Sequence, residues 1–301
     1  MPLPDPTPPK ELFHRYLVAN LEVWSNVVLP GRRIRRTEVP KRLRELGFQP
    51  WGGYETPVIT RLEGRGQVAG LDTAYEAQWR GAEACRLWLD GHGQFEIQRL
   101  SHGILLYFRG DQAPPDDILL GPPLLLVLTL GSIYTLHASA LTMSGRSIAF
   151  CGESGAGKST VAALFARRGW RRLADDQLAV HCDGGPGLGA PQPLPQLKLP
   201  QQDRGSGPPP LTTVYALKPS QRQTSRFTRL QGGQAVHEVL AAITPFSLYS
   251  PSLGGRALAA VGRAVSTASL KVHRIDYPHR PQALEEVYRE IAEDSTEVLS
   301  A

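Results

Sequence analysis

Two stretches of the first half of the chain are the clearest strand candidates: "ACRLWLD" at residues 84–90, where apolar and polar residues alternate at 85–87, and the short apolar run of "GILLYFRG" at 103–110. A period of two is typical of strands with one buried face, so residues from about 56 to 109 are predicted to be rich in β-structure. Nearer the N-terminus, apolar residues have helical spacing in "KELFHRYLVANLEVW" at 10–24, and "VPKRLRELGF" at 39–48 has the same pattern. Both segments are therefore predicted to be helices.

Residues 118–136 carry no charge and are long enough to suggest a membrane span. However, Gly121-Pro122-Pro123 interrupts the apolar run early, and Gly131-Ser132 divides the remainder. A short buried helix followed by a core strand fits this pattern better. No membrane span is predicted.

Strands and helices alternate in the second half. The predicted order is a strand at 133–141, a strand at 146–151, a helix at 158–168, and strands at 171–175 and 177–182. A Pro- and Gly-rich tract at 184–210 precedes a strand in "TTVYAL", a helix in "QAVHEVLAAI", a strand in "LKVHRIDY" and a helix in "PQALEEVYREIA". Such alternation predicts an α/β sheet with a right-handed crossover.

The change from β-rich to alternating pattern suggests two domains. "DQAPPDD" at 111–117 is the best candidate for a linker. We therefore predict a smaller α+β region at residues 1–112, a candidate for substrate recognition, and an α/β catalytic domain at 113–301.

Composition narrows the class of protein. The 301 residues include 41% hydrophobic and 20% charged side chains, as in ordinary globular proteins. The net charge of +5 is too small to indicate nucleic-acid binding, and none is predicted. The three cysteines form no paired motif, and the first residues, "MPLPDPTPPKELFHRYL", lack a secretory pattern. These features predict a cytoplasmic protein, and they leave a homo-oligomer open.

The segment Gly152-Glu153-Ser154-Gly155-Ala156-Gly157-Lys158-Ser159-Thr160 matches a complete phosphate-binding loop, G-x-x-x-x-G-K-[ST]. Its glycines let backbone N–H groups turn toward phosphates, and the following helix directs its positive dipole end at them. Lys158 is predicted to reach the β- and γ-phosphates, and the Ser159 hydroxyl to bind Mg²⁺. A nucleotide, ATP, and Mg²⁺ are the expected ligands.

The adjacent carboxylates Asp175 and Asp176 lie where a helix and a short strand return the chain to the loop. Because neighbours on a strand point to opposite faces, one is expected to face the site and the other its periphery. A carboxylate there can organise the metal or accept a proton from an attacking hydroxyl. The alternative is a solvated acidic turn paired with Arg171 or Arg172.

His137, in "LHASAL", is predicted to lie on a strand beside the loop strand. A buried structural histidine and a residue of the phosphoryl site are both compatible with this position.

Together, "HASAL", "GESGAGKST" and "RRGWRRLADDQ", within residues 136–180, resemble the catalytic domain of the HPr kinase/phosphorylase family, especially its kinase-only relatives, which include peptide-tailoring kinases. The resemblance implies a P-loop kinase domain of HPr kinase type. It also implies that Lys158 and Ser159 bind phosphate and metal, that Asp176 is the general base, that Asp175 assists the metal or the base, and that His137 supports the phosphoryl site.

The chain departs from the family pattern in two places. Gln202 stands where the family's metal segment, echoed at residues 202–207, has a glutamate, and the C-terminal segment tied to dephosphorylation is not found. These departures favour a kinase without phosphorylase activity. Arg222, Arg226 and Arg229 could supply further positive charge to the γ-phosphate, but a solvated basic face is the favoured interpretation.

The leading hypothesis is an ATP- and Mg²⁺-dependent kinase that phosphorylates a serine hydroxyl of a peptide or small protein. A kinase for a small hydroxylated metabolite would use the same site. A regulatory protein that binds nucleotide without transferring phosphate is the alternative from a different class.

Overall fold

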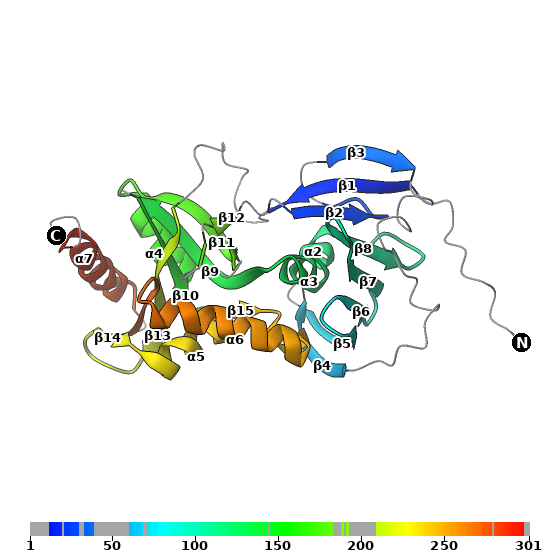
Figure 1. Ribbon diagram of the computed structural model, residues 1–301. Coiled ribbons are helices and arrows are strands. Elements are labelled where there is room, and N and C mark those ends of the chain that lie inside the picture. Colours follow the sequence, from blue (N-terminus) through cyan, green and yellow to red (C-terminus); the bar gives the residue numbers. More distant parts are fainter. Residues whose placement is uncertain are drawn as a thin grey trace, which may run out of the picture. The chain divides into compact units, whose positions relative to one another are not determined.

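The computed structural model describes residues 12–19, 21–29, 33–38, 60–68, 71–143, 145–182, 188–189, 191–192, 209–278 and 280–297 (Figure 1). The chain forms a mixed α/β fold with two sheets. It divides into two compact units, Met1–Ile133 with Ser247–Gly254, and Tyr134–Phe246 with Gly255–Ala301. The sequence-based boundary at 112/113 precedes two helices that the structure groups with the first unit.

The described part of the first unit contains one mixed sheet with strand order β3-β1-β2-β8-β7-β6-β5-β4. Its strands are β1 (Leu12–Val18), β2 (Leu21–Ser25), β3 (Arg33–Glu38), β4 (Thr60–Val68), β5 (Leu71–Arg80), β6 (Ala84–Leu89), β7 (Gly93–Arg99) and β8 (Ile104–Arg109). Two helices follow, α2 (Asp116–Leu119) and α3 (Pro122–Leu130), and α3 packs against β7 and β8. The β-rich reading of residues 56–109 is confirmed wherever these residues are described.

The predicted helix at 10–24 is wrong, because the segment forms the antiparallel hairpin β1–β2. His14, Tyr16 and Val18 are buried and alternate with more exposed neighbours, so the same residues also satisfy a period of two. Ala19 turns the chain with a φ of 49°, and pairing of β2 with β8 supplies hydrogen-bond partners that a local pattern cannot reveal. The second predicted helix, at 39–48, lies outside the described residues.

The uncharged segment forms the end of α2, then α3 and the start of β9 (Ile133–Met143). The buried helix and the core strand were predicted, and α2 was not. All but the first residue of α3 are buried. Among the described helices, none combines the length and apolar character needed to cross a membrane.

The second unit contains the other mixed sheet, with strand order β12-β11-β9-β10-β13-β16-β14 and β15 paired beside β9. Its remaining strands are β10 (Arg146–Cys151), β11 (Arg171–His181), β12 (Pro191–Gln192), β13 (Leu211–Ser220), β14 (Arg226–Leu230), β15 (Ile243–Thr244) and β16 (Lys271–Pro278). The helical segments are α4 (Lys158–Ala166), α5 (Gly232–Ala242), η1 (Phe246–Leu248), α6 (Pro251–Ser266) and α7 (Pro281–Glu297). The two strands predicted at 171–175 and 177–182 are one strand, β11, and α6 and β14 were not predicted.

One face of this sheet carries the core against α4 and α7. Phe150 of β10, Leu217 of β13 and Tyr277 of β16 join Phe165 of α4 and Val287 of α7 in one buried cluster. α5 contacts β16. This core fixes the start of α4 at the end of β10, where the phosphate-binding motif lies.

Candidate functional site

The phosphate-loop motif joins β10 to α4, as the sequence predicted. Gly152, Gly155 and Gly157 have φ angles of 144°, 80° and 78°, in the region that favours glycine. A Cβ atom at Gly152 would lie 2.6 Å from the carbonyl oxygen of Leu217. The first glycine of the motif is therefore required by the packing of the loop against β13.

Lys158, the first residue of α4, is only 8% exposed. Its Nζ donates to the carbonyl oxygens of Gly152 and Glu153, at 2.8 and 3.0 Å. These bonds hold the ammonium group against the inside of the loop, while Glu153, Ser154 and Thr160 are exposed. The loop thus brings a fixed cation and a helix N-terminus together, the combination that suits phosphate.

Tyr277 on β16 holds the loop in place through its hydroxyl group. This role was not predicted from the sequence. The buried hydroxyl of Tyr277 donates to the carbonyl oxygen of Ala156 at 2.6 Å and lies 3.1 Å from the Cβ position of Gly157. Burial raises the pKa of this phenol. Because Tyr277 lies 121 residues after Ala156, only the tertiary structure shows that it holds the loop.

Asp175 lies directly beside the first turn of α4. Its Oδ1 accepts hydrogen bonds from the hydroxyls of Ser159 on α4 and Ser139 on β9, both at 2.7 Å. Its Oδ2 lies 2.7 Å from Nη2 of Arg172. Asp175 is 7% exposed, so this carboxylate joins α4, β9 and β11 in a shielded polar cluster.

The surroundings of Asp175 favour its ionised form. Burial alone raises the pKa of a carboxyl group, but the hydrogen bonds from Ser159 and Ser139 and the charge of Arg172 act in the opposite direction. The net effect is a pKa below the ordinary value of 3.8. Asp175 therefore presents a negative charge to the loop at neutral pH.

Asp176 has a φ of 103°, although it is not glycine and lies within β11. Its carbonyl oxygen and its Oδ1 lie 3.1 and 3.2 Å from Nδ1 of His137 on β9. A carbonyl oxygen can only accept a hydrogen bond, so Nδ1 carries the proton. His137 thus holds Asp176 from the neighbouring strand, and the Asp176 side chain remains 40% exposed.

Both carboxylates contact side chains on the same face of β9, whereas the sequence led us to expect that one would face the site and the other its periphery. They contact Ser139 and His137, two residues apart on β9 and hence on one face. Ser139 is directly opposite Phe150 of β10 in the sheet, so their side chains share a face. Phe150 packs on the face that carries α4. A positive φ at Asp176 breaks the regular alternation of β11 and accounts for this arrangement.

The arginines at 222–229 are not brought to the carboxylates. Arg222, Arg226 and Arg229 are exposed, and β14 is an edge strand separated from β10 by β13 and β16. Arg172, one of the two arginines considered as partners of a solvated acidic turn, contacts Asp175, but Asp175 is buried on β11 and is not part of a solvated turn. Residues 202–207, the echo of the family's metal segment, lie outside the described residues.

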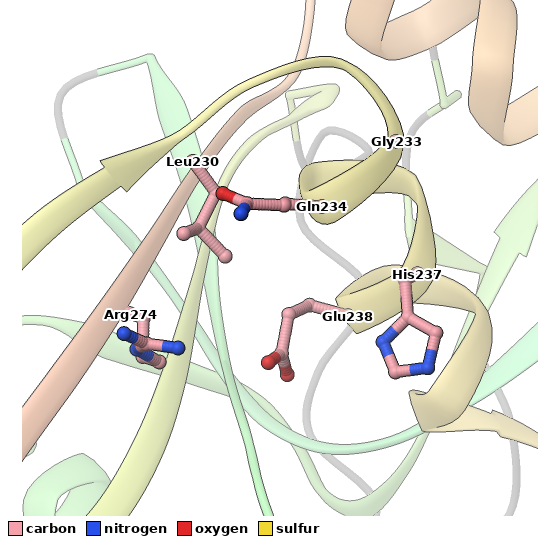
Figure 2. A pocket seen from close by; sticks show the side chains of 6 residues that line it. All are labelled: Leu230, Gly233, Gln234, His237, Glu238 and Arg274. Atoms are coloured by element: carbon pink, nitrogen blue, oxygen red, sulfur yellow. The ribbon is translucent and has the colours of Figure 1, made fainter.

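A separate cavity of about 320 Å³ is lined by Leu230, Gly233, Gln234, His237, Glu238 and Arg274. Figure 2 shows Gln234 and Glu238 projecting from α5 toward Leu230 and Arg274. Glu238 pairs with Lys218 at 3.4 Å. Because Lys218 follows Leu217, which packs on the α4 side, this cavity lies on the opposite face of the sheet from Asp175.

Comparison of the chain with protein-family models and with curated proteins returned no match.

Proposed function

We propose that this chain is an ATP- and Mg²⁺-dependent kinase that phosphorylates a serine hydroxyl of a peptide or small protein, in a P-loop domain of HPr kinase type. The observation that carries the proposal is the hydrogen bond that the Ser159 hydroxyl of the phosphate loop donates to Asp175. The next residue, Asp176, contacts His137 on the neighbouring strand β9. A chance glycine-rich turn does not account for a buried lysine bonded to the loop's carbonyl oxygens together with a carboxylate bonded to the loop's hydroxyl.

The residues around Asp175 fit Mg²⁺. The Ser159 hydroxyl and the Asp175 carboxylate share a hydrogen bond of 2.7 Å and are oxygen donors of the kind that this hard cation prefers. Ser159 and Asp175 would hold the ion, which when bound neutralises charge on the β- and γ-phosphates.

Asp176 is the proposed general base. Its carboxylate is partly exposed and is oriented by the Nδ1 proton of His137. In the transfer step, the serine oxygen forms a bond to the γ-phosphorus, the bond from that phosphorus to the leaving oxygen of ADP breaks, and the hydroxyl proton passes to Asp176. Lys158 and the N-terminus of α4 stabilise the negative charge of the phosphates.

The class of acceptor is supported by the sequence resemblance alone. A small hydroxylated metabolite is the second candidate acceptor, because the same loop, metal ligands and base suit any hydroxyl. A regulatory protein that binds nucleotide without transferring phosphate is distinguished from a kinase because it forms no phosphorylated product.

The test has two arms. First, binding of ATP to the full chain is measured by calorimetry with and without Mg²⁺. Second, the chain is incubated with γ-labelled ATP, Mg²⁺ and an array of serine-containing peptides, and in parallel with a set of hydroxylated metabolites. Label on peptide serine supports the proposal, and label on metabolites alone supports the second candidate. Tight binding with no transfer to either set contradicts a kinase.

A further inference from the structure

The ion pair between Arg172 and Asp175 has no role in the chemistry described above. Nη2 of Arg172 lies 2.7 Å from Oδ2 of Asp175, the oxygen opposite the one that accepts the two serine hydroxyls. The two side chains are 23% and 8% exposed. The pair is therefore shielded from solvent and is stronger than an ordinary surface ion pair.

The geometry of β11 makes this pair unusual. Residues three apart on a regular strand point to opposite faces, yet Arg172 and Asp175 are in contact. The irregularity of the β11 backbone lies at the next residue, Asp176, which has a φ of 103°. β11 thus brings a cation to the proposed metal ligand directly beside this irregular position.

The guanidinium group is not fully satisfied where it lies. In the part of the chain that the structure describes, the buried Nε–H of Arg172 has no hydrogen-bond acceptor. A buried donor without an acceptor costs free energy, so displacing this side chain from Asp175 is less costly than displacing a fully bonded arginine.

We infer that Arg172 is an internal counter-ion that competes with Mg²⁺ for Asp175 and so sets the Mg²⁺ concentration at which the site binds Mg²⁺ with nucleotide. The inference rests on the proposed function. A fixed positive charge beside a carboxylate reduces the attraction of that carboxylate for a second cation. Arg172 also stabilises the buried charge of Asp175 when no metal is bound.

The experiment measures binding of a non-hydrolysable ATP analogue across a Mg²⁺ series at neutral pH, where Asp175 is ionised. Arg172→Gln removes the charge but keeps a hydrogen-bond donor, and Arg172→Met is a second neutral variant. Arg172→Lys keeps the charge. Arg171→Gln is the matched control, because Arg171 is the exposed neighbour on the same strand.

Loss of one charge-assisted bond predicts that the Mg²⁺ concentration for half-maximal binding falls about tenfold in the two neutral variants. Arg172→Lys and Arg171→Gln should stay within about twofold of wild type, because each leaves a positive charge beside Asp175. Binding of the analogue without Mg²⁺ should change little in any variant. Thermal unfolding should show a lower midpoint for the neutral variants in metal-free buffer and a larger upward shift on adding Mg²⁺.

An unchanged or higher Mg²⁺ requirement in folded Arg172→Gln or Arg172→Met overturns the counter-ion role and leaves the kinase proposal intact. If the wild-type chain fails to bind the analogue at every Mg²⁺ concentration in the series, the kinase proposal itself is overturned.

Discussion

Strands β6 and β11 follow different rules. Along β6, Cys85, Leu87 and Leu89 are fully buried and alternate with more exposed residues, so the burial pattern is the one that a strand with one core face requires. Along β11, Asp176 has a left-handed φ of 103° within the strand. The first strand serves the core alone. The second departs from the rule at the residues we assign to chemistry.

The contrast between the two strands points to Asp176, where the backbone is strained. A non-glycine residue in the left-handed region costs roughly 1–3 kcal/mol and persists only where its surroundings hold it. At Asp176 the surroundings are His137 on β9 and the neighbouring carboxylate cluster. Backbone strain that core packing does not explain is typical of functional positions.

The largest expected effect is at the loop itself. Lys158→Ala removes the cation that contacts the carbonyl oxygens of Gly152 and Glu153, so nucleotide binding should weaken strongly and transfer should be lost. Arg167→Ala, an exposed basic residue at the other end of α4, is the control and should behave like wild type. Calorimetry and transfer assays measure both. Normal turnover by Lys158→Ala would break the assignment of the phosphate loop.

The next effect concerns the proposed base. Asp176→Asn keeps the size of the side chain but cannot accept the proton of the serine, so single-turnover transfer should fall by about 10²–10⁴-fold. Affinity for ATP should change little, because Asp176 is not a proposed phosphate ligand. Rapid-quench measurements with saturating nucleotide separate the two quantities. Transfer at the wild-type rate would remove Asp176 from the mechanism.

A smaller effect is expected on acid stability. The pKa of Asp175 is lowered in the folded state, so the stabilisation is fully present above the ordinary value of 3.8 and is lost as the pH falls through the lower, folded-state pKa. Asp175→Asn should cost about 2 kcal/mol of unfolding free energy near neutral pH, from lost charge-assisted hydrogen bonds. The variant should also lose this part of the acid dependence. Denaturant unfolding from neutral to acid pH measures both, and parallel pH profiles would contradict the role given to the cluster.

The smallest effect tests the strand comparison directly. In a regular strand glycine is less stable than alanine by roughly 0.5–1 kcal/mol, so Ala84→Gly on β6 should destabilise the chain by about that amount. At Asp176 the order should reverse. Asp176→Gly should be more stable than Asp176→Ala by about 1 kcal/mol, because only glycine adopts a φ of 103° without strain. Denaturant unfolding decides the order, and the same sign at both positions would show that β11 carries no strain.

The sequence predicted the loop region well because its signals are local. The motif from Gly152 to Ser159 specifies a strand, a glycine turn and a helix within a few residues, and β10 and α4 lie where these signals placed them. The hairpin at residues 12–25 was missed because its apolar spacing fits a helix and a strand, and pairing with β8 decides between them.

The contacts that complete the candidate site could not be predicted, because they join distant parts of the chain. Ser139 meets Asp175 across 36 residues, and Tyr277 meets Ala156 across 121. The left-handed φ of Asp176 has no sequence signal, since aspartate on a strand is expected to be extended. The sequence thus identified both carboxylates but not the backbone conformation that places them on one face.

The central claim is that Asp175 and Asp176 share one face of the sheet but act differently, one on the metal and one on the proton. Single-turnover transfer by Asp175→Asn and Asp176→Asn across a Mg²⁺ series tests this most directly. Added Mg²⁺ should partly restore transfer by Asp175→Asn, because mass action offsets a weakened metal site, and it should not restore Asp176→Asn, which lacks the base. Equal rescue of both variants would contradict the account, because it would show that the two carboxylates share a single metal role.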